Sequence, residues 1–140
     1  MAVSLERMEI IAALFMDDIQ LRSVPGPSTR IDLSGIQFSA PAPAPVPVSV
    51  GPHLAVIVWC HPNEEGFGSL EVVFRPLDGD PEAEPLARNV QALQLEPGKF
   101  NYRLVRAEIE FEDYGTVLAH CTIGKGHTHV VPYTLLPPAE

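Results

Sequence analysis

Basic residues are few in this chain, and they do not cluster. Its 140 residues include nine Lys and Arg against eighteen Asp and Glu, which gives a formal net charge of −9. Nucleic-acid binding depends on grouped Lys and Arg side chains that displace counterions from phosphates. Anionic membrane surfaces attract the same kind of basic patch. We therefore expect no nucleic-acid partner and no membrane partner, and the charge mainly favours solubility.

Long hydrophobic runs and a secretory leader are also missing. The apolar run near the N-terminus covers only residues 10–16, whereas a membrane-spanning helix needs roughly 20 apolar residues. Acidic residues flank this run on both sides, but a signal peptide has a basic lead and a small-residue cleavage site. The sequence therefore predicts a cytoplasmic protein.

Cysteine is scarce, and the common catalytic motifs are absent. Cys60 and Cys121 lie far apart in the sequence, which in a reducing cytosol favours buried thiols. A disulfide or a shared metal is the alternative. The chain has no glycine-rich dinucleotide or phosphate loop, no G-x-S-x-G, no C-x-x-C and no H-E-x-x-H. We therefore expect that the protein is not an enzyme.

Proline, glycine and short apolar segments are what the chain has in quantity. Fifteen prolines and ten glycines favour many turns and short elements. Apolar segments of strand length recur, with turn signals roughly every ten residues; they include residues 9–16, 53–62, 116–123 and 129–136. The length and the 46% hydrophobic content fit one domain spanning residues 1–140. The prediction is an all-β fold, an antiparallel β-sandwich of about seven to nine strands.

Several segments carry more specific expectations. Residues 98–115 alternate apolar and charged side chains, which indicates a strand with one dry and one wet face. Residues 9–16 suit a buried strand, although a helix over residues 4–19 is an alternative. Gly35 interrupts an alternating pattern and indicates a β-bulge. Pro132 indicates that the C-terminal strand lies at a sheet edge.

The segment from residue 40 to residue 52 is rich in proline. Prolines at positions 41, 43, 45 and 47 rule out a central strand, because each one removes a backbone donor. We expect a polyproline connector or edge segment within the domain. The alternative is a docking motif for the aromatic groove of a partner protein.

Taken together, four segments resemble a known group of proteins. They read IIAALFMDD, LSGIQFSAPAPAPVPVSVGPHLAVIV, EVVFRPLDGD and LEPGKFNYRLV. In these strand patterns and a proline–glycine turn the chain is similar to a group of short uncharacterised proteins common in actinobacteria. The resemblance covers most of the chain and implies a bacterial, cytoplasmic, single-domain β-sandwich. It carries no activity and no catalytic residues.

The stretch HCTIGKGHTHVV, residues 120–131, holds the best candidate for a functional site. Alternate residues of a strand share a face, so the side-chain grouping depends on the hairpin register. A two-residue loop, residues 124–125, places His120 opposite His129 and gathers His120, His127 and His129 on one face. A three-residue loop, residues 124–126, places Cys121 opposite His129 and gathers one cysteine with two histidines. Either group could bind zinc or another transition metal, with Cys60 or His61 as a further ligand.

Desolvation of the imidazoles favours the two-residue loop. In that register no imidazole is buried, Val130 joins the apolar face, and Gly124 suits a type II′ turn. The three-residue loop would bury a histidine pair. Only an H-x-H fragment of the cupin metal motif is present, since no glutamate follows it. The acidic stretch LDGDPEAE, residues 77–84, lacks a twelve-residue calcium loop and indicates a solvated loop.

These observations lead to two hypotheses about function. The first is a non-catalytic β-sandwich module, without a cofactor, that binds a protein partner or assembles with itself as a homo-oligomer. It follows from the missing motifs and from the apolar first and last strands, since exposed strand edges favour pairing between chains. The alternative is a metal-binding protein that holds zinc at His120, His127 and His129.

Overall fold

The structure is a computed structural model that describes residues 8–24, 28–63, 66–80, 82–124 and 126–139. These residues form twelve strands and no helix, which confirms the predicted all-β class. Nine strands have at least seven residues and three have only three, so the longer strands match the predicted number. Within the same ranges no helix is long and apolar enough to span a membrane.

The smaller layer of the sandwich is a three-stranded antiparallel sheet. Its strand order is β1 (Met8–Phe15), β6 (His53–Cys60) and β9 (Phe100–Arg106). The predicted N-terminal strand is confirmed and the helix alternative is wrong, because β1 pairs with β6 along its length. The β-bulge lies at Ile11, where the register shifts between Ile10 and Ala12.

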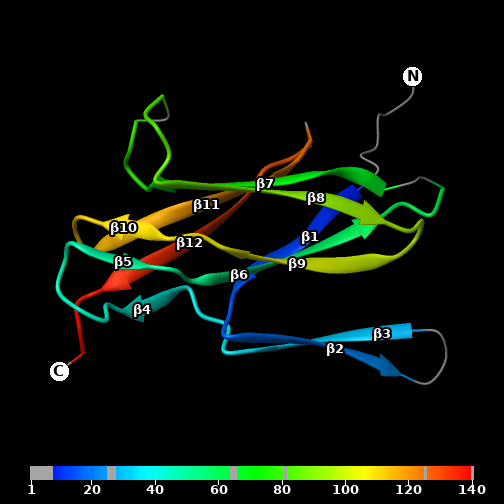
Figure 1. Cartoon of the computed structure of the whole chain (residues 1–140), viewed down its shortest axis with the longest axis horizontal. Coiled ribbons are helices and arrows are strands. Elements are labelled where there is room, and N and C mark those ends of the chain that lie inside the picture. Colours follow the sequence, from blue (N-terminus) through cyan, green and yellow to red (C-terminus); the bar gives the residue numbers. More distant parts are fainter. Residues whose placement is uncertain (1–7, 25–27, 64–65, 81, 125, 140) are drawn as a thin grey trace.

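The larger layer is a five-stranded sheet. Its order is β4 (Ser39–Pro41), β12 (His129–Leu136), β11 (Gly115–Ile123), β7 (Gly66–Pro76) and β8 (Ala87–Leu95). All its pairs are antiparallel except β4 with β12. Figure 1 shows this sheet facing β6 and β9 across the core. The core is filled by alternate side chains of both sheets, among them Leu54, Val56, Leu70, Phe74, Ala119 and Leu135, each at most 1% exposed.

The predicted strand over residues 98–115 is divided between two sheets. After β9 the chain crosses to β10 (Ile109–Phe111), which pairs with β5 (Val48–Val50). The alternation of burial continues across this break, since Val105, Ile109 and Phe111 are all buried. The alternation with a period of two therefore follows from which side chains face the core. It continues from β9 to β10 although β9 pairs with β6 and β10 pairs with β5.

The prolines lie in short strands or where a strand has no second neighbour. The proline-rich segment contributes β4, at one edge of the larger sheet, and β5, in the two-stranded sheet. The prediction that Pro132 lies in an edge strand is wrong for β12 as a whole, because β12 lies between β11 and β4. However, β4 pairs only with residues 134–136. Pro132 therefore lies where β12 has no second neighbour, and a missing donor costs nothing there.

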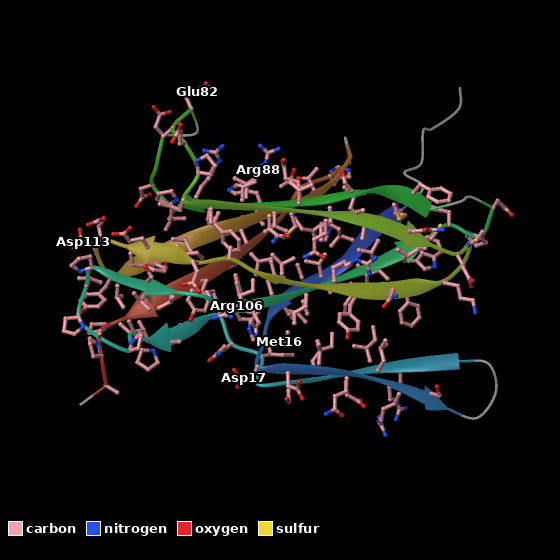
Figure 2. All side chains as sticks on the ribbon, in the orientation of Figure 1. Met16, Asp17, Glu82, Arg88, Arg106 and Asp113 are labelled. Atoms are coloured by element: carbon pink, nitrogen blue, oxygen red, sulfur yellow. The ribbon has the colours of Figure 1, made fainter. Side chains whose placement is uncertain are left out.

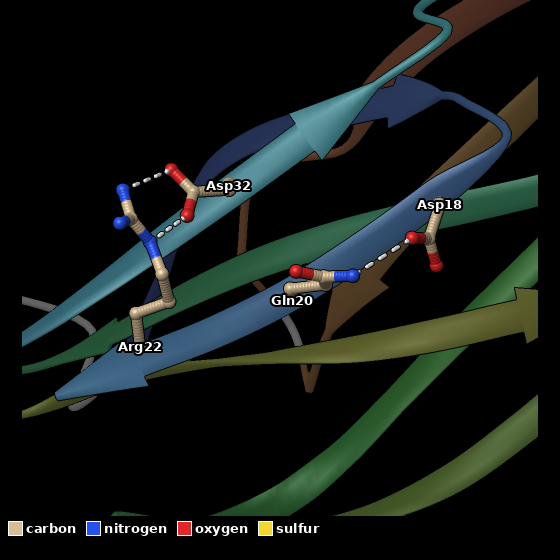
Figure 3. Close-up of polar contacts among 4 residues, drawn as sticks. All are labelled: Asp18, Gln20, Arg22 and Asp32. Carbon is tan, nitrogen blue, oxygen red and sulfur yellow. Dashed lines mark hydrogen bonds and ion pairs between the residues drawn. The ribbon is translucent and has the colours of Figure 1, made fainter.

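A hairpin of two strands, β2 (Asp18–Val24) and β3 (Ser28–Ser34), forms a third element that we call the arm. Figure 1 shows it on the side of β6 and β9 that faces away from β7 and β8. Paired residues share a face, which makes the arm amphipathic; its apolar face carries Ile19, Leu21, Ile31 and Leu33. On the opposite face Arg22 forms a bidentate ion pair with Asp32, as Figure 3 shows.

The base of the arm is fixed to the sandwich by backbone hydrogen bonds. Met16 N donates to His53 O at 3.1 Å, and Gln37 N donates to Phe15 O at 2.9 Å. Gly35 follows the end of β3 with a positive φ of 68°, so the predicted irregularity lies just outside the strand. An L-residue adopts this conformation only at a cost.

Replacing Gly35 with alanine should reduce stability more than replacing Gly124 with alanine. Both glycines have positive φ, 68° and 56°, where an added Cβ costs about 1–2 kcal/mol. At Gly35 the new Cβ would also collide with the Asp17 side chain, whereas at Gly124 nothing lies within 4 Å. Chemical denaturation of both variants measures the two losses in unfolding free energy. Equal losses would contradict the crowding at Asp17.

Candidate functional site

The histidine hairpin turns at the predicted position. Gly126 N donates to Ile123 O at 2.9 Å, which closes a turn between these two residues. Gly124 has a φ of 56°, the positive value that the turn needs. Local turn chemistry in the sequence was therefore sufficient to place the reversal of the chain.

The register beyond this turn differs from the predicted one by a single residue. Cys121 lies opposite His129, and His120 lies opposite Val130. The preferred pairing of His120 with His129 is therefore wrong, and the chain accommodates one extra residue between Gly126 and His129. The other register, with Cys121 opposite His129, is the one that forms.

The reason lies in the other residues of β12. In the observed register Val131 and Tyr133 lie opposite Ala119 and Val117, and all four are buried. A slip by one residue would turn every inward side chain of β12 outward. Val130, which was expected on the apolar face, is instead 47% exposed. Packing of the core side chains therefore determines the register, and the register determines on which face of the sheet each histidine lies.

The candidate ligands are consequently divided between two faces of the larger sheet. His120 lies on the outer face, where burial, and secondarily the nearby Arg75 charge, lower its pKa. His129 lies on the inner face beside Cys121, at the end of the core. His127 is exposed and His129 is partly buried, so the expected buried histidine pair does not form.

His127 and His129 line one small pocket at the open edge between the two sheets. Its volume is about 290 Å³, and its apolar lining comes from Met8, Ile10 and Ile123. Glu9 is also part of the lining. The sequence correctly placed these two histidines on a common side, but it did not indicate that β1 completes the pocket.

Cys60 and His61 lie at the end of β6, on the other side of β1. Cys60 is buried. The His61 ring packs on Trp59, with 4.5 Å between ring centroids. His61 Nε2 is buried without a hydrogen-bond partner among the described residues and lies 3.8 Å from Glu9 Oε1. Glu9 therefore borders both the His61 side chain and the pocket of His127 and His129.

The described part of the chain contains no group of three or more His, Cys, Asp or Glu side chains that could hold a metal ion. Burial raises the pKa of the Cys121 thiol to about 12. A thiol in that state stays protonated at neutral pH, whereas a metal binds the thiolate. The pocket is therefore lined by two histidines and one glutamate together with apolar residues, without a group of three metal ligands among the described residues.

A second surface, which the sequence interpretation missed, lies on the outer face of the three-stranded sheet. Strand pairing places nine apolar or aromatic side chains on this outer face, namely Ile11, Ala12, Leu14, Ala55, Ile57, Trp59, Phe100, Tyr102 and Leu104. The apolar face of the arm covers part of it and leaves a groove of about 440 Å³. Ile11, Ile57 and Phe100 line this groove from the sheet, and Arg30 and Ile31 line it from the arm.

The sequence did contain a signal for this surface. Residues 54–60 are apolar without interruption, which indicates a strand covered on both faces. The three-stranded sheet is therefore apolar toward the core and also toward the arm. Ile11, Phe100 and Leu104 nevertheless remain 56%, 47% and 42% exposed.

Comparison with known proteins bears on the fold alone. The chain matches no known protein family model and no curated protein. Among solved structures it is similar to a β-glucosidase from Erythrobacter marinus, with a TM-score of 0.50, 15% identity, and coverage of 71% of this chain and 14% of that one. It is also similar to a β-glucosidase from Listeria innocua in complex with gluconolactone, with a TM-score of 0.54, 8% identity, and coverage of 88% and 16%. The chain spans a small part of each.

The hairpin register can be tested by oxidation of engineered thiols. A His129→Cys variant places a second thiol directly opposite Cys121 on the same face, within reach of a disulfide. A Val130→Cys variant places its thiol opposite His120, on the other face. We expect mild oxidation to form the intramolecular bridge in the first variant only, detected by mass spectrometry and thiol titration. Absence of a bridge in the His129→Cys variant, or a bridge in the Val130→Cys variant, would contradict the observed register.

The buried Cys121 thiol should make stability depend on pH in the alkaline range. Its pKa is raised from 9.0 to about 12 in the folded chain. The protonated thiol is favoured by folding, so its contribution is fully present below about pH 9 and is lost as the pH rises toward 12. The difference in unfolding free energy between the natural chain and a Cys121→Ala variant should therefore shrink above pH 9. A constant difference would contradict the raised pKa.

Proposed function

We propose that this chain is a non-catalytic β-sandwich module that self-associates through the outer face of its three-stranded sheet. The observation that supports the proposal is the apolar outer face and its incomplete cover. Exposed Ile11 and Phe100 line one groove, and exposed Leu104 lies on the same face of the sheet. Contiguous apolar surface of this kind usually marks an interaction site, whereas single exposed apolar residues need no explanation.

A second copy is the partner whose chemistry best fits this face. Within one molecule, Ile31 of the arm lines the same groove as Ile57 and Phe100 of the sheet. The arm also leaves Leu21 47% exposed. Each copy therefore carries both an apolar sheet face and an apolar arm edge, which a twofold arrangement would bring together.

The charges around the groove suit association between identical chains. The polar face of the arm carries two carboxylates and two guanidinium groups, from Asp18, Arg22, Arg30 and Asp32. Arg22 and Asp32 neutralise each other. The chain has a net charge of −9, but these four residues of the arm carry no net charge together. The arm therefore adds little repulsion between two copies that meet at the groove beside it.

The non-catalytic part of the proposal is supported by how the polar side chains are distributed. His120 lies on the opposite face of β11 from Cys121 and His129. The pocket of His127 and His129 is small and mostly apolar, with Glu9 as its carboxylate. Catalysis by these histidines would require them to be gathered in one cleft with the groups that they assist, and they are divided between two faces.

Replacing Ile11 with lysine should weaken self-association, whereas replacing Val90 with lysine should not. Both side chains are 56% exposed, but Ile11 lines the groove and Val90 lies on β8, in the other sheet. Light scattering over a range of protein concentrations measures the dimer dissociation constant of each chain. We expect Ile11→Lys to raise it by about tenfold or more, equivalent to about 1.4 kcal/mol.

Two results would contradict the proposal. One is a natural chain that stays monomeric at the highest concentration reached. The other is a dimer that Val90→Lys weakens as much as Ile11→Lys does. Thermal unfolding of both variants serves as the control, because each change is at the surface and should leave the monomer folded.

A further inference from the structure

A cleft distinct from the groove lies at the end of the sandwich where β10 leads into β11. Its volume is about 700 Å³. One wall is formed by residues 76–79 and Leu86, and the other runs from Glu110 to Val117. Figure 2 shows Glu82 and Asp113 at this same end of the molecule. The buried Phe111 and Val117 are part of the lining.

Hydrogen bonds hold both walls in place. Leu77 N donates to Thr116 O at 3.1 Å, which ties the two walls together, and Leu86 N donates to Phe74 O at 2.8 Å. The Tyr114 hydroxyl accepts from the backbone N of Val46 at 3.4 Å. The cleft is therefore formed before any ligand arrives, which reduces the entropy lost on binding.

The lining combines apolar side chains with carboxylates. Leu77, Leu86 and Tyr114 are 53%, 40% and 37% exposed. Four acidic side chains share the lining, namely Asp78, Glu110, Glu112 and Asp113. None of these four forms an ion pair with a basic side chain in the described part of the chain, and no Lys, Arg or His lines the cleft.

The geometry points to a basic polypeptide segment of a partner protein as the occupant, and we propose that this cleft binds it. Lys and Arg side chains have aliphatic stems and cationic ends. The stems match Leu77, Leu86 and Tyr114, and the cationic ends match the carboxylates at the rim. The nearby carboxylates of Asp80, Glu82 and Glu84 add to the same negative potential, which would attract a basic segment before contact.

A bare metal ion fits this cleft less well than a basic segment. The carboxylates do not converge on a point, since no group of three or more Asp, Glu, His or Cys side chains in the described residues could hold a metal ion. Cationic side chains on an extended segment are spaced apart and reach separate carboxylates. The apolar part of the lining also has no role in binding a metal ion.

The first test measures peptide binding to the full chain. The probe is a short labelled peptide of alternating leucine and arginine, and the control peptide carries glutamate in place of arginine. Fluorescence anisotropy should show binding of the arginine peptide alone, with an affinity that falls as salt is raised. Because the Ile11→Lys variant is expected to be mainly monomeric, titrating it in parallel separates this result from self-association.

Variants then locate the binding site. Asp78→Asn combined with Glu112→Gln should weaken binding by about tenfold, because two exposed ion pairs are lost. Asp18→Asn combined with Glu96→Gln removes two exposed carboxylates elsewhere and should leave the affinity unchanged. Leu86→Ser should weaken binding without changing its salt dependence, because it removes only apolar contact.

Amide chemical shifts of the natural chain provide a readout that needs no variant. On addition of the arginine peptide they should change around Leu77, Leu86 and Gly115. The proposal is overturned if neither peptide binds, if the two double variants bind equally well, or if the shifts change elsewhere. Stabilisation by calcium that Asp78→Asn with Glu112→Gln abolishes would assign a metal site in its place.

Discussion

The alternation of buried side chains along paired strands is the constraint on which the rest of this structure depends. In the last hairpin it brings Val131, Tyr133 and Leu135 against the inner residues of β11. Burying each such side chain is worth roughly 1.5–3 kcal/mol, so three of them outweigh the roughly 1–3 kcal/mol that a poorly solvated polar group costs. His129 is therefore drawn to the inner face, and His120 is left on the outer one.

The same constraint, applied to the smaller sheet, produces the arm and its groove. β6 lies between β1 and β9, and its two faces are both apolar. One face meets the larger sheet, while the other would lie open to water without the arm. An isolated two-stranded hairpin is marginally stable, so the arm and the outer face stabilise each other. Two strands are too narrow to cover three, which is why Ile11 and Phe100 stay exposed.

Sequence patterns predicted the strands themselves better than they predicted which strands pair and in which register. The class, most long strands and the turn at Gly124 follow from local chemistry. The missed strand β2 also carries a local signal, because Ile19 and Leu21 alternate with Gln20 and Arg22. The hairpin register did not follow, since Gly124 fits either loop length and only the opposite sheet selects between them. The partition of residues 98–115 between β9 and β10 likewise depends on partners distant in sequence.

The uneven distribution of charge over the surface distinguishes the two proposed interfaces. Asp78, Glu110, Glu112 and Asp113 gather at one end of the sandwich, where they remain exposed to solvent. The arm instead carries both signs in balance. A like-charged chain is therefore repelled from the acidic end and meets little repulsion at the groove. The outer face suits a second copy and the acidic cleft suits a partner of opposite charge, so the two surfaces select different partners.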